Sequence, residues 1–185
     1  MKRSHVTVLL SGGIDSAATL AFYKKRRALL DAVFVDYGQP PRASEWAAAQ
    51  TLAARILVPV TRTRLGFALP VDKGEYFGRN ALLALAAVAN STRPPAIIAL
   101  GLHAGCPYYD TTTQFLGDMQ RLLDGYSNGA ITIAAPFLES TKEEIVRFAR
   151  RLRVPLALTY SCERRNSPPC GECLSCVDRG GAHVD

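Results

Sequence analysis

The sequence HVTVLLSGGIDS, from His5 to Ser16, decides the fold. Its apolar first half, His5 to Leu10, predicts a buried parallel strand, and the residues from Ala17 to Arg27 predict a helix. A Gly-Gly turn between such a strand and such a helix leaves bare backbone N–H groups at a helix N-terminus. The turn SGGIDS is therefore a candidate phosphate site. Its spacing differs from both the Gly-x-Gly-x-x-Gly fingerprint and the Walker pattern with its lysine.

Apolar runs alternate with helical patterns along the rest of the chain. This alternation predicts an α/β fold, a doubly wound parallel five-stranded sheet with helices on both faces. Ligands of such sheets bind beyond the carboxyl ends of the strands, which here lie at Leu10, Asp36 and Gly101. The run Ser140–Glu144 predicts a capping box that opens the last helix, and Thr61–Gly78 is expected to be a long irregular connection. We expect strands at residues 5–10, 31–36, 56–61, 96–101 and 130–135, and helices at residues 16–28, 41–55, 79–92, 111–124 and 141–152.

Length and composition limit the class of protein. The chain has 185 residues, 48% of them hydrophobic, which suits a single domain over residues 1–185 with a packed core. We expect a nucleotide-binding core over residues 1–155 and a cysteine-bearing segment over residues 156–185. No apolar run is long enough to cross a membrane and no signal peptide is evident, so we expect a cytoplasmic protein. The net charge of +6 fits a protein that handles phosphates, and we interpret it as a solvated arginine-rich surface rather than a nucleic-acid groove.

Four cysteines near the end of the chain form a candidate metal site. Successive members are separated by seven, two and two residues, so three thiolates surround one point and the remaining one closes a tetrahedron. Four thiolates favour a closed, structural zinc site, whereas spacing alone leaves an iron–sulfur cluster open. A disulfide is disfavoured in a chain without a secretion signal. The four are Cys162, Cys170, Cys173 and Cys176, and a fifth, Cys106, lies elsewhere near His103 and is expected to be a small buried or loop residue.

Together these motifs resemble the QueC family, the 7-cyano-7-deazaguanine synthases. SGGIDS alone is similar to the loops of NAD, GMP and asparagine synthetases and of tRNA thiolases, where it holds pyrophosphate. The more specific resemblance lies in the cysteine tail and in DYGQ, which follows the second strand. The resemblance implies a HUP-type adenine nucleotide fold. The motifs that carry it are SGGIDS from Ser11, DYGQ from Asp36, GRN from Gly78, APFL from Ala135, TKE from Thr141 and CGECLSC from Cys170.

The resemblance also implies an activity, that of an ATP-dependent carbon–nitrogen ligase. In that family ATP adenylates the carboxylate of 7-carboxy-7-deazaguanine, and ammonia then displaces AMP to give an amide. A second ATP activates the amide oxygen, and loss of AMP leaves the nitrile. The implied cofactors are ATP, Mg²⁺ and Zn²⁺. The implied partners are a small carboxylate substrate and ammonia, with a homodimer left open.

Individual residues take expected roles from the matched motifs. The expected catalytic residues are Ser11, Asp15, Ser16 and Lys142. The expected nucleotide-binding residues are Leu10, Ser11, Gly12, Gly13, Ile14, Asp15, Ser16, Ala17, Asp36 and Gly101. The expected substrate-binding residues are Tyr37, Gln39, Arg79, Asn80 and Asp110.

Elementary chemistry supports part of this assignment. Adenylation gives a carboxylate a good leaving group, and backbone N–H groups around Gly12 and Gly13 suit the departing pyrophosphate. Asp15 would repel phosphate unless Mg²⁺ lies between them, and a helix N-cap is its alternative role. Lys142 falls in the first turn of a helix, where the dipole disfavours a cation. A phosphate contact would explain Lys142, and a solvated surface lysine is the alternative.

Three departures from the family pattern fall where the deazapurine is expected. Phe77 replaces a proline, the loop 103–112 lacks Tyr-Pro-Asp-Cys, and the connection before Arg79 is short. Adenylation is therefore better supported than the acyl substrate. The alternatives are a paralogue that passes a related carboxylate to a different amine, including one on a macromolecule, a tRNA thiolase whose sulfur carrier would be Cys106, and a nucleotide-sensing module. Whether residues 61–78 form a lid stays open.

Overall fold

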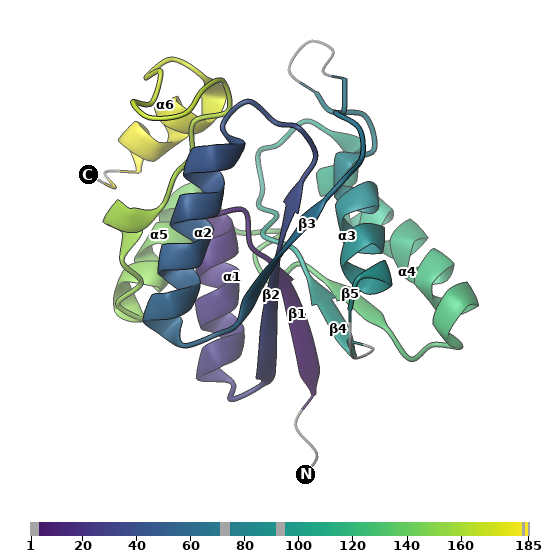
Figure 1. Cartoon of the computed structure of the whole chain (residues 1–185). Helices are drawn as coiled ribbons and strands as arrows, with labels where there is room; N and C mark the ends of the chain where they lie inside the picture. Colours follow the sequence, from purple (N-terminus) through teal and green to yellow (C-terminus); the bar gives the residue numbers. More distant parts are fainter. Residues whose placement is uncertain (1–3, 71–74, 92–94, 183, 185) are drawn as a thin grey trace.

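The computed structural model describes residues 4–70, 75–91, 95–182 and 184, and its centre is a five-stranded sheet (Figure 1). The strand order is β3-β2-β1-β4-β5, and every neighbouring pair is parallel. The order reverses between β1 and β4, so the topological switch point lies at their carboxyl ends. The strands are β1 His5–Leu9, β2 Leu29–Asp36, β3 Val60–Arg64, β4 Ile97–Ala99 and β5 Thr132–Ala134.

Helices cover both faces of this sheet, which confirms the predicted doubly wound α/β fold. Figure 1 shows α1, α2 and α5 on one side and α3 and α4 on the other. One cluster of buried apolar side chains packs α1 and α2 on the sheet, another packs α3 and α4 on it, and a third joins α5 to α1. The helices are α1 Ile14–Lys25, α2 Arg42–Ile56, α3 Arg79–Ala89, α4 Thr113–Ser127, α5 Lys142–Arg151 and α6 Leu174–Gly181.

The central strand β1 explains why the chain folds this way. Successive side chains of a strand point to opposite faces, so an unbroken apolar run is stable only where both faces are covered. Val6, Val8 and Leu10 pack in the cluster beneath α1 and α2, whereas Leu9 packs in the cluster beneath α3 and α4. The strand is therefore buried on both sides, and the turn that follows it emerges at the centre of the carboxyl edge.

The position predicted for the third strand is wrong. Ile56 ends α2 instead, Leu57 adopts a left-handed conformation with φ 57°, and β3 runs over Val60–Arg64. The apolar run that suggested a strand is the end of the helix and the turn after it, where Ile56 is partly buried, Leu57 is exposed and Val58 lies in the core. The strand itself is the polar segment VTRTR at the edge of the sheet, where only one strand pairs with it, so it lacks the apolar signal of a central strand.

The end of the chain also differs from the loop-rich segment that the sequence predicts, because α6 follows Cys173. The helix predicted at 79–92 ends at Ala89, and residue 92 lies outside the described residues, as does 71–74 of the expected connection 61–78. The other elements lie where they were predicted, with shifted ends. Within the described part of the chain, no helix has the length and apolar character needed to cross a membrane.

Candidate active site

A cavity of about 700 Å³ opens at the carboxyl edge of the sheet, at the switch point. The ends of β1 and β2, the loops after β2 and β4, the first turns of α1, α2, α3 and α5, and the tail around α6 line it. Its lining has an apolar part and a polar part. The polar part comes from the β1–α1 turn, the turn after β2, the starts of α2, α3 and α5, the loop after β4 and the tail. The apolar part includes Leu10, Ile14 and Phe34 from the side of α1 and α2. Its larger share comes from the core beneath α3 and α4 and comprises Leu9, Val33, Val35, Leu83, Leu100 and Leu102.

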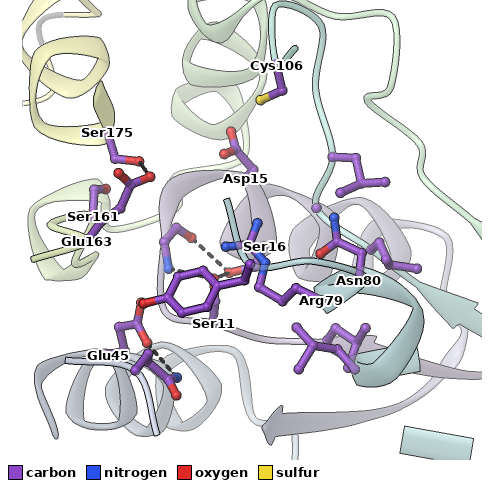
Figure 2. Close-up of a pocket in the computed structure, with 18 of the residues that line it drawn as sticks. Ser11, Asp15, Ser16, Glu45, Arg79, Asn80, Cys106, Ser161, Glu163 and Ser175 are labelled. Atoms are coloured by element: carbon purple, nitrogen blue, oxygen red, sulfur yellow. Dashed lines mark hydrogen bonds between the residues drawn. The ribbon is translucent and has the colours of Figure 1, made fainter. Parts of the chain in front are cut away.

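The turn after β1 forms the floor of the cavity (Figure 2). Gly13 is the N-cap of α1 and supplies no side-chain cap, so the first N–H groups of the helix have no capping partner. The Gly13 N–H donates to Ser11 Oγ (3.3 Å), Ser11 Oγ donates to Ser16 Oγ (3.1 Å), and Ser16 Oγ donates to the Gly13 carbonyl (3.0 Å). An uncapped helix start beside two hydroxyl groups is suited to bind an anion.

Two glycines allow the surrounding elements to approach this turn. Gly12 has φ +87°, and a Cβ there would lie 2.5 Å from the carbonyl oxygen of Glu45 on α2. A Cβ on Gly101, two residues after the end of β4, would lie 2.6 Å from the backbone nitrogen of Ser16 and 2.8 Å from the carbonyl carbon of Asp15. Any side chain at either position would push the turn away from its neighbours.

The residues predicted to bind nucleotide divide into two groups. Ala17 lies outside the lining, and its N–H closes the first helical bond to the Gly13 carbonyl at 3.1 Å. Gly12 and Asp36 also lie outside the lining. The group that lines the cavity consists of Leu10, Ser11, Gly13, Ile14, Asp15, Ser16 and Gly101.

Asp36 differs from its predicted place because its carboxylate turns toward the edge strand. Arg62 donates to it at 2.6 Å, Arg64 lies 3.4 Å away, and the Gly38 N–H donates at 3.1 Å. Burial by itself would raise the pKa of Asp36, but the hydrogen bonds from Arg62 and Gly38 hold this pKa below its ordinary value. The carboxylate fastens β3 to β2 and shapes the turn after β2, and it does not face the cavity.

Asp15 and Lys142 meet in the cavity although 127 positions separate them in the chain. Lys142 Nζ lies 2.6 and 2.8 Å from the two carboxylate oxygens of Asp15, and the side chains are only 15% and 20% exposed. His103 Nε2 lies 3.9 Å from the same carboxylate. The surface-lysine interpretation of Lys142 is therefore wrong, and so is the N-cap interpretation of Asp15, because Gly13 holds that position.

The start of α5 explains how Lys142 is presented. The predicted capping box is confirmed, with Thr141 Oγ1 accepting from the Glu144 N–H and the Glu144 carboxylate accepting from the Thr141 N–H. These two bonds satisfy N–H groups of the helix start without using the lysine. Lys142, the first residue of the helix, is thus free to extend toward the β1–α1 turn.

Tyr37 and Arg79 form another wall of the cavity. Tyr37 is 8% exposed, and burial raises its pKa to about 12, so its phenol stays neutral. The Tyr37 and Tyr76 rings meet edge to face with centroids 5.3 Å apart, and the Arg79 guanidinium lies 5.8 Å from the Tyr76 ring. Burial alone would lower the pKa of Arg79, but the neighbouring Tyr37 and Asp110 raise it. The Arg79 guanidinium therefore stays protonated and places a positive charge in the cavity wall.

Gln39 lines the cavity but uses its amide inside the protein. It is 3% exposed, its Oε1 accepts from the Tyr37 N–H (2.9 Å), and its Nε2 donates to the Val35 carbonyl (3.4 Å) and to Glu45 Oε2 (2.8 Å). Its contact with substrate stays a prediction. What the structure adds is that Gln39 fixes the turn after β2 and orients Glu45.

Asn80 and Asp110 are paired across the cavity wall. The Asn80 N–H donates to Asp110 Oδ2 at 3.1 Å, and Asn80 Nδ2 donates to the Asp110 carbonyl at 3.0 Å. Both are buried and both line the cavity. These bonds tie the start of α3 to the loop that follows β4. A direct contact of either side chain with substrate remains a prediction.

The tail contributes cavity residues that sequence reasoning missed. Ser175 Oγ donates to Glu163 Oε1 at 2.6 Å, and Arg179 donates to Thr159 Oγ1 at 2.6 Å. The available signal was their position between or beside the four cysteines, which must fold around one point. Glu45, in the first turn of the helix after DYGQ, was missed as well. The missed lining residues include Glu45, Tyr160, Ser161, Glu163, Ser175 and Asp178.

The four tail cysteines come together as predicted, with sulfur atoms all within 4.8 Å of one another. Burial alone would raise the pKa of Cys162, but backbone N–H groups of Cys170 and Arg164 hold it lower, at about 6. Hydrogen bonds from backbone N–H groups, that of Glu172 first, also lower the pKa of Cys170. Burial, together with the neighbouring Cys173 and Cys170, raises the pKa of Cys176 to about 12. Four sulfur donors around one point suit a tetrahedral zinc ion, whose positive charge would favour the thiolate form of each.

Cys106 lies in the cavity wall beside His103, with its Sγ 3.6 Å from Nε2 of that ring. His103 Nδ1 lies 2.6 Å from the Ala104 carbonyl, which can only accept, so Nδ1 carries the proton of this contact. Burial raises the pKa of the Cys106 thiol, which favours the neutral form. A neutral thiol is a poor nucleophile, so these surroundings give no support to a sulfur-carrier role.

Comparison with known proteins identifies the relatives of this chain. The family model described as "Queuosine biosynthesis protein QueC" matches residues 5–69 and 75–185. A 7-cyano-7-deazaguanine synthase of Aquifex aeolicus is 31% identical over 96% of this chain and 95% of its own, and one of Persephonella marina is 32% identical over 95% and 90%. A further relative of the same name, from Rhizobium etli, is 30% identical over 93% of this chain and 84% of its own.

A solved structure supports the fold. The predicted subunit of tRNA methyltransferase from Methanocaldococcus jannaschii superposes with a TM-score of 0.58 over 80% of this chain and 76% of its own. At 15% identity this likeness concerns the fold alone. The family match covers nearly the whole chain, including the β1–α1 turn, the turn after β2 and the cysteine tail. The chain therefore belongs to the QueC family.

Proposed function

We propose that this protein is an ATP-dependent synthase that converts 7-carboxy-7-deazaguanine into 7-cyano-7-deazaguanine. Relatives that match nearly its full length carry the name of that synthase. The observation that carries the proposal is the meeting of Asp15 and Lys142 beside the uncapped start of α1, in one cavity. Such a group of charges and N–H donors suits a polyphosphate whose negative charge grows as it leaves.

The nucleotide is proposed to lie across the switch point. Its β and γ phosphates bind the N–H groups after Gly13 and the hydroxyls of Ser11 and Ser16, with the Lys142 ammonium next to them. Its base lies against the apolar part of the cavity. Asp15 is the carboxylate of this turn that would hold Mg²⁺, since a carboxylate together with substrate phosphates is the usual magnesium ligand set. When bound there, Mg²⁺ supplies positive charge to the polyphosphate.

The first activation makes the substrate carboxylate reactive. One carboxylate oxygen attacks the α-phosphorus of ATP, the bond from that phosphorus to its bridging oxygen breaks, and pyrophosphate leaves. Ammonia then attacks the acyl carbon, AMP departs with the attacking oxygen, and a proton passes from nitrogen to solvent, which gives the amide. The residues of the β1–α1 turn and Lys142 hold the pyrophosphate as it departs.

The second activation removes the remaining oxygen. The amide oxygen attacks the α-phosphorus of another ATP, pyrophosphate leaves again, and loss of AMP with the amide protons leaves the carbon–nitrogen triple bond. One site serves both activations because each is an attack by an oxygen of the same substrate on the same phosphorus. Arg79, a permanent cation in the wall, is proposed to hold the substrate near that phosphorus.

The remaining proposals concern the protein as a whole. The cysteine set is proposed to bind structural zinc, which fastens the segment 156–185 to the nucleotide-binding core 1–155. Ammonia is the proposed nitrogen donor, the cytoplasm the proposed location, and a homodimer the proposed assembly. The sulfur cluster supports the first of these, because four thiolates otherwise repel one another.

The test is a product analysis. Purified protein is incubated with ATP, Mg²⁺, ammonium and 7-carboxy-7-deazaguanine, and the products are identified by liquid chromatography and mass spectrometry. The proposal predicts AMP, pyrophosphate and 7-cyano-7-deazaguanine, each dependent on the carboxylate. ADP and phosphate in place of AMP and pyrophosphate would contradict the assignment of the turn. AMP without nitrile would show a different acceptor.

A further inference from the structure

Glu45 is a half-buried carboxylate in the lining of the cavity, and the mechanism above does not use it. It stands in the first turn of α2, whose backbone packs against Gly12 of the β1–α1 turn. Its Oε2 accepts a hydrogen bond of 2.8 Å from Gln39 Nε2. Among the residues that the structure describes, no cation forms an ion pair with it. The carboxylate keeps unused acceptor positions on both oxygens.

The orientation of this carboxylate is fixed by its partner. Gln39 is almost fully buried, and its other amide contacts go to backbone groups of Tyr37 and Val35, so it cannot turn away. Gln39 is therefore a positioning residue for Glu45. Figure 2 shows Glu45 on one side of Ser11 and Ser16, while Arg79 and Asn80 lie on the other side.

The surroundings of Glu45 disfavour its charged form. Burial raises the pKa of Glu45 to about 7, the Gln39 hydrogen bond and the Arg79 charge oppose this rise, and the charges of Glu163 and Asp36 add to it. A carboxylate that is desolvated to this degree is stabilised by any ligand that brings N–H donors to it. The acceptor positions of Glu45 that Gln39 does not occupy are therefore available to N–H donors of a ligand.

The neighbours of Glu45 suit a flat ligand. Tyr37 and Tyr76 present aromatic rings in the cavity wall, and the planar guanidinium of Arg79 lies beside them. Tyr37, Tyr76 and Arg79 all lie close enough to Glu45 for its charge to affect their pKa values or for theirs to affect its own. Rings and a guanidinium next to an acceptor are suited to a planar heterocycle that carries N–H groups on its edge.

We propose that Glu45 determines substrate specificity by accepting the adjacent ring N–H and amino N–H groups on the 2-aminopyrimidinone edge of the deazaguanine. The two carboxylate oxygens match two parallel N–H donors on one edge. This proposal rests on the proposed function and names the residue that reads the heterocycle. It gives Gln39 an indirect role, through Glu45.

The test compares Glu45→Gln with wild type and with Glu139→Gln, an exposed matched control. The dissociation constant of 7-carboxy-7-deazaguanine is measured by calorimetry, which needs no turnover, and KM and kcat are measured for each substrate. Since a charged hydrogen bond is lost, Glu45→Gln should weaken binding roughly 10- to 100-fold. The KM for ATP should change by less than about twofold, and Glu139→Gln should behave as wild type.

A second ligand sharpens the result. The analogue 7-carboxy-7-deazahypoxanthine lacks the 2-amino group, so wild type should bind it much more weakly than the parent compound, and Glu45→Gln should lose most of this preference. The single variant Gln39→Met should bind the parent compound more weakly than wild type. The double variant with Glu45→Gln should bind it about as weakly as Glu45→Gln alone.

Three results would overturn the proposal: unchanged binding in Glu45→Gln with full preference for the 2-amino group, a KM increase confined to ammonium, or a fall in kcat with KM unchanged. The first would remove Glu45 from recognition, the second would make it an ammonium site, and the third a proton-transfer group. The proposed function fails separately, if wild type binds the carboxylate but produces no AMP from ATP.

Discussion

Replacement of Glu45 by glutamine should stabilise the protein at high pH, although it weakens substrate binding. The pKa of Glu45 rises from 4.5 in an exposed chain to about 7 in the fold, mainly through burial. Below pH 4.5 the group is neutral in both states and has no effect. Between pH 4.5 and pH 7 the unfolded chain is ionised while the folded protein keeps the proton, so stability falls as pH rises through this range and levels off above pH 7. The shift corresponds to about 3 kcal/mol at most.

Glutamine keeps the shape and the acceptor for Gln39 but carries no charge. We therefore expect Glu45→Gln to exceed wild type by less than about 1 kcal/mol at pH 5 and by up to about 3 kcal/mol at pH 8, the latter roughly 6 to 12 °C in Tm for a domain of this size. The two proteins are compared at the same pH, because protonation of cysteine thiols affects the metal site of both equally.

Thermal unfolding of zinc-loaded wild type, Glu45→Gln and Glu139→Gln, followed by circular dichroism at intervals from pH 5 to pH 8.5, is the assay. The expected difference grows from pH 5 to about pH 7 and then levels off for the first variant, and it stays near zero for the second, whose side chain is exposed. A constant difference across this range, or a lower Tm of Glu45→Gln at pH 8, would refute the reasoning that burial of this carboxylate costs stability.

Further changes probe other parts of the site. Gly101→Ala places a Cβ 2.6 Å from the Ser16 nitrogen and should lower Tm and raise the KM for ATP at least about tenfold, and unchanged values would contradict the tight approach. Lys142→Met leaves Asp15 without its cation and should slow AMP formation by about 100-fold or more with intact circular dichroism, whereas the exposed control Lys25→Met should be normal. Elemental analysis should find one zinc per chain. Cys162→Ser should lose the zinc and show faster hydrogen exchange in residues 160–182. Iron in place of zinc would contradict the assignment of a structural zinc site.

The sequence predicted those parts of the fold whose signals are local. The apolar run before Ser11 is buried on both faces of the sheet, and such a run identifies a central parallel strand without further information. The capping box at Thr141 likewise lies within a few residues. The edge strand Val60–Arg64 escaped prediction because its polar alternation resembles an exposed loop. The short α6 escaped because cysteines and glycines dominate its sequence.

The candidate site was predictable only as far as its residues lie in motifs. The cysteine spacing fixes the sulfur cluster, and the β1–α1 turn places Ser11 and Asp15 at the switch point. No local pattern shows that Lys142 reaches Asp15 across 127 positions, because that contact depends on how α1 and α5 pack. No local pattern shows that the Asp36 carboxylate contacts Arg62 or that Glu45 lines the cavity, because both orientations depend on tertiary packing.

The central claim is that the cavity transfers the adenylyl group to oxygen atoms of a substrate carboxylate. The most direct measurement uses 7-carboxy-7-deazaguanine with ¹⁸O in both carboxylate positions, together with ATP, Mg²⁺ and ammonium, and mass spectrometry of the AMP formed. The account predicts about two AMP for each nitrile, each carrying one ¹⁸O, because both oxygens leave on phosphorus. AMP that forms without ¹⁸O, or a label that appears in water or phosphate, would contradict it.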